Sequence, residues 1–373
     1  MRTICEFEQC TGCHACMNVC PVNCIDMKEN EYGFLYPKIL IDKCTDCGLC
    51  KKICPVENPV VLSESTHVYA AINKQKVDYE TATSGGIATL FSRRILSENG
   101  SVYGVAINEE LDIRHICVEC AEDIERIKGS KYVQSRIGNI FLRVREDLRS
   151  GKKVLFIGTP CQIAGLKKFL RKDYVNLYTC DIVCHGVPSK KMLMNHIESL
   201  GYKNRKNRIV FRDKEGFYLT VLDSEGKVLY RKKNFYDIYY IGFLKGLLYR
   251  KSCFLCQFAK PQRVGDITLG DFWGFDSSKG EFPVTTTNGL SLIMVNTQKG
   301  KSLFEECSDG LIFIERTLEE AVNGNRQLKC PSKRHKNHEF FEKQYTKLGF
   351  EKAAKSALWK ERIVYAIIDR IGK

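Results

Sequence analysis

The sequence lacks the long apolar segments that mark membrane-spanning or exported proteins. No uninterrupted run of about 18 apolar residues occurs in its 373 residues, so we expect no helix that crosses a bilayer. No apolar stretch follows Met1-Arg2-Thr3 that would export the chain, and we therefore expect a cytoplasmic protein. In that reducing compartment the 19 cysteines are not expected to form a disulfide scaffold, so they need another explanation.

Acidic residues are scarce in two segments, which makes the formal net charge of +14 uneven. Residues 1–60 carry 6 basic and 8 acidic side chains, whereas residues 201–233 carry 10 and 4, and residues 326–373 carry 13 and 5. The two basic segments are either ordinary solvated surface or a face that attracts an anionic small molecule, an acidic partner or a membrane surface. No recognition-helix or RNA-binding motif accompanies the charge, so we expect no nucleic-acid partner.

The cysteines near the N-terminus form two copies of one pattern, C-x2-C-x2-C-x3-C-P. Bacterial ferredoxins use this run to bind two 4Fe-4S clusters, and the fourth cysteine of each run binds the cluster of the other run. A structural zinc site needs two C-x2-C pairs and has no use for a third cysteine in the same loop. The predicted ligands are Cys10, Cys13, Cys16 and Cys54 for one cluster, and Cys44, Cys47, Cys50 and Cys20 for the other. We therefore expect the protein to transfer electrons.

The residue pattern predicts an α+β fold with a ferredoxin-like domain at residues 1–60, a larger mixed α/β domain at 65–345 and a basic, amphipathic helix at 346–373. Residues 153–157 form a continuous apolar run typical of a buried parallel strand, and helical spacing follows it. Further strands are expected at 68–72, 102–107, 116–120, 175–183, 267–269 and 292–295, with an antiparallel meander at 209–230, and helices at 87–96, 136–148, 162–170, 235–250 and 339–371. The last helix packs on the body, on another protein or on a membrane surface.

Four further cysteines are predicted to converge on one site. Cys161 follows the strand at 153–157 and starts a helix, while Cys184 ends the next strand. Because parallel strands end at the same edge of a sheet, we expect these two thiols to lie close together. Cys253 and Cys256 add a C-x2-C pair from a loop. The residues alone therefore indicate a third 4Fe-4S cluster, with a tetrahedral zinc ion as the alternative.

The other cysteines are interpreted as structural. Cys180 competes with Cys184, but four residues of a strand span roughly 13 Å, so both thiols cannot reach one cube. Cys117 and Cys120 are expected to point to opposite faces of a strand. Buried, small apolar roles are expected for Cys5, Cys24, Cys307 and Cys330.

Three segments have a composition that suits a flavin, which a cluster protein usually needs for chemistry on an organic molecule. The first, at 84–86, is a phosphate cradle at a helix start or an ordinary helix cap. The second, at 128–132, is a binding loop for a pyrophosphate and a flavin ring or a solvated loop. The third, at 265–274, faces a cofactor or serves turns and core. The candidate residues are Ser84, Gly85, Gly86, Lys128, Gly129, Ser130, Lys131, Tyr132, Asp266 and Asp271.

Six motifs occur in the order found in one protein family. They are Ser84-Gly-Gly86, Gly129-Ser-Lys-Tyr132, Gly158-Thr-Pro-Cys-Gln162, Cys184-His-Gly-Val-Pro188, Cys253-x2-Cys256 and Gly265-Asp-Ile-Thr-Leu-Gly-Asp-Phe-Trp-Gly274. The chain resembles the coenzyme F420 hydrogenase/dehydrogenase beta subunits, fused behind a two-cluster ferredoxin domain. Members are FAD-containing iron-sulfur proteins, and the thiols that match the four converging cysteines ligate a cluster beside the flavin. The resemblance therefore implies three 4Fe-4S clusters and FAD, the last carried by the motifs around Ser84, Lys131 and Asp271.

The resemblance implies an anaerobic iron-sulfur flavoprotein oxidoreductase. In such a protein FAD exchanges a hydride with coenzyme F420 or another organic substrate, and many similar bacterial chains accompany polysaccharide-synthesis genes. The alternative is an electron-relay subunit of a larger redox complex, with no substrate of its own. We expect a redox partner protein or ferredoxin and an anionic small molecule as partners. The sequence identifies no catalytic residue, and His185 is interpreted either as a proton relay or as a structural histidine.

Overall fold

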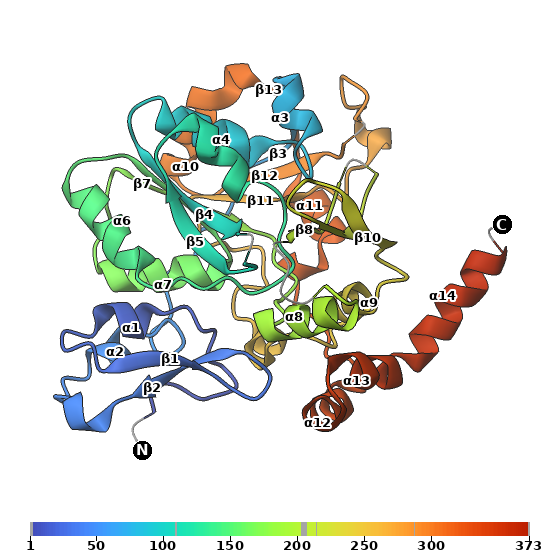
Figure 1. Ribbon diagram of the computed structural model, residues 1–373. Helices are drawn as coiled ribbons and strands as arrows, with labels where there is room; N and C mark the ends of the chain where they lie inside the picture. The colour runs from blue at the N-terminus through green and yellow to red at the C-terminus, as the bar shows by residue number, and fades with distance from the viewer. Residues whose placement is uncertain (1–2, 109, 203–206, 214, 287, 372–373) are drawn as a thin grey trace.

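The computed structural model describes residues 3–108, 110–202, 207–213, 215–286 and 288–371. Figure 1 shows an N-terminal module (blue), an eight-stranded sheet covered by helices, a three-stranded sheet and a set of C-terminal helices (red). This arrangement confirms the predicted α+β fold with a ferredoxin-like module in front and a helical tail at the end. No helix in these described stretches is long and apolar enough to cross a membrane.

The two cysteine runs of the N-terminal module adopt the same backbone shape. The residues on either side of the second cysteine have left-handed backbone in both runs: Gly12 and His14 in the first (φ 66° and 63°), Asp46 and Gly48 in the second (φ 56° and 68°). A repeat in the sequence is therefore a repeat in the structure. The elements of the module are α1 (Ala15–Val19), β1 (Ile25–Glu29), β2 (Leu35–Ile39), η1 (Ile41–Lys43) and α2 (Leu49–Lys52).

The large sheet has a parallel centre and antiparallel edges. Its strands are β3 (His67–Asn73), β4 (Ser101–Ile107), β5 (Ile113–Val118), β6 (Val154–Gly158), β7 (Leu177–Ile182), β11 (Ile267–Asp271), β12 (Ser291–Val295) and β13 (Leu311–Arg316). Their spatial order is β13-β3-β12-β11-β7-β6-β4-β5. Strands β4, β6, β7 and β11 pair in parallel, so their carboxyl ends meet at one edge. The predicted βαβ unit is therefore confirmed.

Helices cover both faces of the sheet because the side chains of β6 alternate between two cores. Leu155 packs on one face with residues of α4 and α10. Val154 and Phe156 pack on the other face with α6 and α7, and Ala15 and Ile53 of the N-terminal module join that core. The module therefore rests on the α6/α7 side. The helices around the sheet are α3 (Lys76–Glu80), α4 (Ile87–Leu96), η2 (Ala121–Asp123), α5 (Ile124–Ile127), α6 (Ile140–Arg149), α7 (Pro160–Leu170), η4 (Ser277–Lys279), α10 (Gln298–Cys307), η5 (Ser308–Gly310), α11 (Leu318–Gly324) and η6 (Arg326–Leu328).

The three-stranded sheet and the C-terminal helices share a second large core. Its elements are α8 (Lys190–Ser199), β8 (Arg208–Val210), β9 (Tyr218–Leu222), β10 (Val228–Lys233), α9 (Ile238–Leu244), η3 (Lys251–Leu255), α12 (His338–Leu348), α13 (Phe350–Ala357) and α14 (Trp359–Ile371). The predicted meander is confirmed, and so is the helical tail predicted at 339–371, which consists of three helices. Gly349, with φ 77°, separates α12 from α13, and Leu358 separates α13 from α14; α12 and α13 fold against the body while α14 extends away from it (Figure 1).

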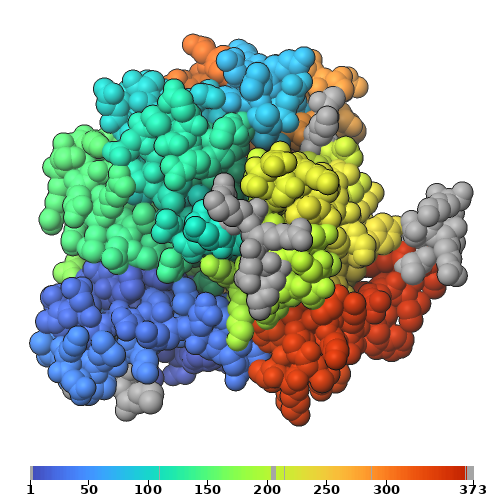
Figure 2. Space-filling view, viewed as in Figure 1, coloured from blue at the N-terminus to red at the C-terminus, as the bar shows by residue number. Residues whose placement is uncertain are grey.

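The N-terminal module lies directly against the rest of the chain. Figure 2 shows its surface (blue) continuous with that of the α6/α7 region (green). A row of polar contacts crosses the junction, because Asn18 donates to the Gly138 carbonyl (2.8 Å) and Gln134 donates to the Thr11 carbonyl (3.1 Å). Buried polar groups that are satisfied across a boundary fix the position of one part on the other.

Candidate iron-sulfur and flavin site

The first set of cysteines lines a small cavity inside the N-terminal module. Cys10, Cys13 and Cys16 come from the first run and Cys54 from the second, and all four are buried. If the fourth cysteine of each run binds the cluster of the other run, Cys54 must lie beside the first run, as it does. Cys5, predicted to be an ordinary buried residue, is half-buried and lines the same cavity. A hydrogen bond from Cys5, with the nearby Arg250 charge, lowers the pKa of Cys10 to about 6.

The second set lies nearer the surface of the module. Cys20, Cys44 and Cys50 pack in a common apolar cluster with Cys24, and Cys47 is exposed. The Cys24 sulfur lies 3.4 Å from the Cys20 sulfur, so this cysteine also sits beside a predicted ligand. The two sets therefore differ in burial: one faces the body of the protein, and the other faces outward.

Helix α7 connects the first set to the large sheet. Gly165 in this helix lies against Cys13, and a Cβ atom at position 165 would be 2.9 Å from the Cys13 sulfur. Cys161 lies four residues earlier in the same helix, which is about one turn. The thiol at the start of α7 and the thiols of the module are therefore separated by about one turn of helix.

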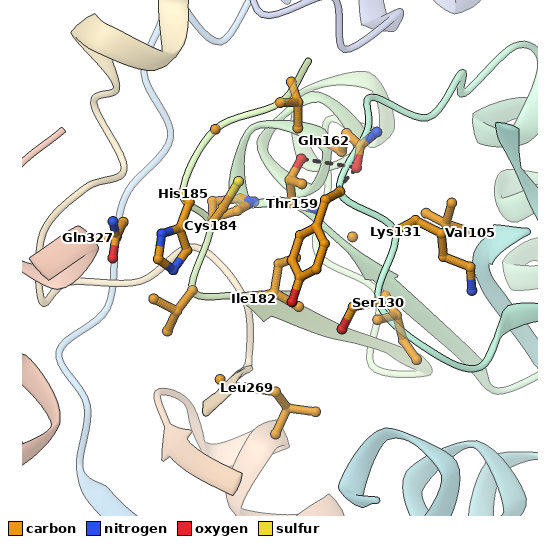
Figure 3. Close-up of a pocket in the computed structure, with 18 of the residues that line it drawn as sticks. Val105, Ser130, Lys131, Thr159, Gln162, Ile182, Cys184, His185, Leu269 and Gln327 are labelled. Carbon is orange, nitrogen blue, oxygen red and sulfur yellow. Dashed lines mark hydrogen bonds between the residues drawn. The ribbon is translucent and has the colours of Figure 1, made fainter. Parts of the chain in front are cut away.

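The main cavity of the protein opens at the carboxyl ends of β6 and β7. Its volume is about 830 Å³, within the range of about 300–1,000 Å³ typical of small-molecule and cofactor sites. The four cysteines predicted to converge all line it: Cys161, Cys184, Cys253 and Cys256. Figure 3 shows Cys184 and His185 on the opposite side of this cavity from Ser130 and Lys131.

Local sequence positions each of the four thiols. In Gly158-Thr159-Pro160-Cys161-Gln162, the Thr159 N–H donates to the Gln162 side chain (3.0 Å), which caps α7, and the Thr159 hydroxyl lies 3.2 Å from the Cys161 sulfur (Figure 3). Cys184 follows β7 by two residues. The Cys253 N–H donates to the Arg250 carbonyl (2.9 Å) in the turn that precedes Cys256.

The cavity thiols are not arranged as a closed zinc site. Zinc-sulfur bonds of about 2.3 Å would bring four sulfurs to within about 4 Å of one another. Across the described ranges, the one group of three such ligand atoms that lie within 4.8 Å of one another is Cys117, Glu119 and Asp147. Its carboxylates already pair with Arg143 and Lys152. The four cavity thiols are therefore spread more widely than a tetrahedral ion requires.

Burial holds the cavity thiols in their protonated form. It raises the pKa of Cys161 to about 11 and that of Cys253 to about 12, and it raises the pKa of Cys184 well above the ordinary value. Because metal ligands are thiolates, assembly of a cluster here would release protons. Cys180, the competitor of Cys184, is buried in the sheet core and does not line the cavity.

The glycine pair before α4 has two different roles. Gly86 caps the helix with φ 77° and no capping side chain, so the first turn of α4 is open to the cavity, which Ser84 and Gly86 both line. Gly85 instead packs against the sheet. A Cβ atom at this position would be 2.4 Å from the Ala71 carbonyl, and the Gly85 N–H donates to the Ser291 hydroxyl (2.9 Å). A free helix N-terminus beside a cavity suits an anionic phosphate.

All five residues of the 128–132 loop line the cavity, but its two lysines differ. The Lys128 ammonium is paired with Glu125 (2.9 Å) and lies 3.7 Å from Asp78. The Lys131 ammonium donates to two carbonyls, those of Ile127 (2.9 Å) and Lys128 (2.7 Å), and burial lowers its pKa to about 7. Lys131 is therefore the lysine of this loop that can respond to an incoming anion.

The two aspartates of the 265–274 segment are also separated by the fold. Asp271 lines the cavity and accepts two hydrogen bonds from Arg212, at 2.9 and 2.7 Å. Asp266 is 2% exposed and accepts hydrogen bonds from the Thr179 N–H (2.8 Å) and hydroxyl (2.6 Å). It therefore holds β11 to β7 and does not reach the cavity.

His185 lines the cavity next to Cys184. Burial lowers the pKa of its imidazole, and the Asp271 charge opposes this shift. Its carbonyl accepts a hydrogen bond from the Ser332 hydroxyl, so both its backbone and its ring face the site. The imidazole is therefore held mainly neutral at the cavity wall.

Three polar cavity residues carry no signal in the sequence: Gln134, Arg212 and Arg250. None belongs to a recognisable short motif, and each reaches the site from a different element. Arg212 lies in the basic segment 201–233, but the sequence does not single it out from the other basic residues there. Its place in the cavity depends on its pairing with Asp271, 59 positions later.

Comparisons with known proteins identify two segments of this chain. Residues 151–320 match the family described as the C terminus of the coenzyme F420 hydrogenase/dehydrogenase beta subunit, and residues 9–58 match the 4Fe-4S dicluster domain. The resemblance predicted from the six motifs is thereby confirmed, as is the dicluster module in front of it.

Two named proteins are similar to this chain over about half of their own length. It is 26% identical over 347 residues to the coenzyme F420-dependent sulfite reductase of Methanocaldococcus jannaschii, which covers 88% of this chain and 50% of the relative. It is 23% identical over 166 residues to the F subunit of the F420H2 dehydrogenase of Methanosarcina mazei, covering 42% and 47%. The chain therefore spans about half the length of the curated relatives it matches. A chain of the xenon-derivatised F420-reducing [NiFe] hydrogenase complex from Methanosarcina barkeri is similar with a TM-score of 0.43 and 17% identity, covering 76% of this chain and 94% of that one.

The beta-subunit segment contains all four cavity thiols but only part of the candidate flavin site. Asp271 and Arg212 lie inside residues 151–320, whereas Ser84 and Lys131 come from the chain before it. The cavity is therefore assembled from the segment that matches the beta subunit, from the dicluster module, and from the stretches that precede and follow residues 151–320.

Proposed function

We propose that the protein is an iron-sulfur flavoprotein oxidoreductase with three 4Fe-4S clusters and one FAD, acting on coenzyme F420 or another anionic organic substrate. The single observation that carries this proposal is the placement of twelve thiols in three groups, running from the surface of the module through its buried side to the main cavity. Such a series suits the transfer of electrons between a partner protein and a molecule bound in the cavity.

The donor sets fit iron-sulfur cubes. The outer cluster would be held by Cys20, Cys44, Cys47 and Cys50, the inner one by Cys10, Cys13, Cys16 and Cys54, and the cavity cluster by Cys161, Cys184, Cys253 and Cys256. When bound, the cubes supply single-electron transfer, and a flavin supplies the conversion between one- and two-electron chemistry. Burial of the four inner-cluster thiols would exclude water from that part of the path.

The walls of the cavity suit a dinucleotide flavin. The open first turn of α4 and the Lys131 ammonium offer donors and positive charge to a pyrophosphate. Across the cavity, Arg212 is fixed by Asp271 and stacks 4.5 Å from the Phe217 ring centre, so its remaining donors are oriented toward an anionic ligand. These residues would bind and orient; none is assigned a covalent role.

The proposal is tested by anaerobic purification followed by iron, sulfide and flavin assays. We expect about twelve iron atoms and one FAD per chain, because three cubes hold about four irons each. About eight iron atoms with no flavin would overturn the enzyme proposal. The protein would then be a two-cluster electron carrier.

The second candidate function is an electron-relay subunit of a larger redox complex. The observations that favour it are that the chain covers only half of the similar sulfite reductase and that the other relative is named as a subunit of a dehydrogenase. A protein that holds FAD, reduces no small molecule alone and becomes active when a partner is added would support the relay. Reduction of coenzyme F420 by the isolated chain would exclude it.

A further inference from the structure

Arg250 is a buried cation located between two predicted clusters. It is 1% exposed and is the largest of the fully buried side chains. Its Nε donates to the Cys10 carbonyl (2.6 Å), one of the inner-cluster cysteines, and its backbone carbonyl accepts from the Cys253 N–H (2.9 Å), one of the cavity cysteines. The side chain therefore spans the boundary between the module and the body.

The guanidinium contacts carbonyls, an amide and an aromatic ring, and a hydrogen bond from Cys5 together with the guanidinium charge lowers the pKa of the nearby Cys10 thiol to about 6. Its nitrogens donate to the carbonyls of Cys10 and Leu35 (3.0 Å) and to the Gln134 side chain (3.4 Å), and its carbon lies 4.0 Å from the Tyr36 ring centre. Within the described residues no carboxylate lies within 4.0 Å of it, in contrast with the buried Arg263, which pairs with Asp181 at 2.7 Å. A buried arginine without a carboxylate partner is costly and is seldom retained without a function.

Iron-sulfur cubes would supply the missing negative charge. A cube held by four thiolates carries a net negative charge, and reduction adds one more electron to it. A fixed cation beside it favours the reduced form and therefore raises the reduction potential, since net charge and hydrogen bonds around the cluster set that potential.

We propose that Arg250 is the counter-charge of the inner and cavity clusters and raises the reduction potentials of both, but not that of the outer cluster. This inference rests on the proposed clusters. It adds that one arginine tunes two neighbouring clusters together, which keeps their potentials close and favours electron transfer in both directions across the boundary. Arg250 acts on the clusters through its charge and takes no part in bond making.

The test is a redox titration with dithionite and mediators, followed by EPR, on three anaerobically purified variants. Arg250→Gln removes the charge, Arg250→Lys keeps it, and Gln134→Glu leaves Arg250 in place but sets a carboxylate beside it. The matched control is Arg316→Gln, which removes a buried arginine that is paired with Glu320 and stacked on the Phe275 ring (4.9 Å), away from the cysteines. Iron content is measured on every sample.

We expect Arg250→Gln and Gln134→Glu each to shift the reduction equilibrium of two clusters at least tenfold toward the oxidised form, which is about 59 mV for one electron. The third cluster, Arg250→Lys and Arg316→Gln should stay close to wild type. If the Arg250→Gln protein binds fewer irons than wild type, the midpoint potentials of Gln134→Glu alone test the role of Arg250. Full iron with all three midpoints unchanged in Gln134→Glu would overturn the role of Arg250 while leaving the clusters in place. A wild-type protein without the cavity cluster would overturn the proposed function itself.

Discussion

At the scale of single residues, contacts between distant parts of the chain determine what the cavity can do. The cysteine ligands could be predicted because iron-sulfur runs are local in sequence and have a fixed spacing. Arg212, Gln134 and Arg250 could not, since each acquires its role from a partner at least 59 positions away. The same reason explains Asp266, which has the motif of a cofactor residue but hydrogen-bonds Thr179 within the sheet.

Gly165 should be the least tolerant position of α7. An alanine there would place its Cβ 2.9 Å from the Cys13 sulfur, so the module would have to move or the inner cluster would lose a ligand. We expect Gly165→Ala to bind fewer irons than wild type and Gly165→Val fewer still, measured after identical anaerobic purification. Lys168→Ala in the same helix is the control. Wild-type iron content and EPR signals in Gly165→Val would contradict a contact between α7 and the cysteine run.

The lowered pKa of Lys131 predicts how flavin binding depends on pH. Its pKa of about 7 would be raised by an anionic phosphate, so affinity should be full below about pH 7 and fall as the pH rises above it. Burial lowers the pKa of the neighbouring His115 to about 4, so that ring stays neutral over this range. Titration of flavin-free protein with FAD, followed by fluorescence between pH 6 and 9, measures the slope.

An arginine at this position stays charged throughout, which provides the control. Lys131→Arg should bind FAD with little dependence on pH, and Lys131→Met should bind weakly at every pH. Lys128→Arg should keep the wild-type slope, because Lys128 already has acidic partners. An identical slope in Lys131→Arg would show that another group titrates.

At the scale of elements, the parallel strands and the helix at 87–96 were predicted well, whereas the edge strand β13 at Leu311–Arg316 was missed. Continuous apolar runs such as 153–157 indicate buried strands directly, and β6 occupies Val154–Gly158. The helical tail was predicted but its division was not, because its apolar spacing continues through Gly349. Gly349, with positive φ, separates α12 from α13, Leu358 separates α13 from α14, and the alanines of α13 pack in the second core.

His196 holds α13 to the body. It is buried, and its ring nitrogens lie 2.8 Å from Asp237 and 3.2 Å from Glu351 of α13. Burial alone would lower its pKa, but the charges and hydrogen bonds of these two acids raise it to about 9 from the ordinary value of 6.5. The stability that it contributes is therefore complete below about pH 6.5 and is lost as the pH rises to about 9.

Replacing this histidine should loosen α13 specifically. Loss of one partner of a buried ion pair costs on the order of 3 kcal/mol, because Asp237 is left buried without its cation. Hydrogen-exchange protection of α13 should fall in His196→Asn at pH 6 and change little at pH 9, with α6 as the internal reference. Equal losses at both pH values would indicate a packing role in place of an ionic one.

At the scale of the whole molecule, the three sets of thiols follow one another from the outer side of the N-terminal module to the main cavity. The exposed set lies on the outer side of the module, the buried set lies against α7, and the third set lies in the cavity at the end of β6 and β7. The sequence could predict the three sets and the parallel strands that carry the last one. It could not predict that Gly165 and Arg250 bring the buried set of the module and the cavity set together, because neither residue belongs to a ligand pattern.

The central claim is a third cube in the main cavity, and iron analysis of a Cys253→Ser/Cys256→Ser variant tests it most directly. We predict that wild-type protein holds about twelve iron atoms per chain and that the variant holds about eight, with the EPR signals of the two N-terminal clusters retained. The Cys117→Ser variant, whose thiol lies outside the cavity, should keep the wild-type content. Equal iron content in wild-type protein and the double variant would contradict the account.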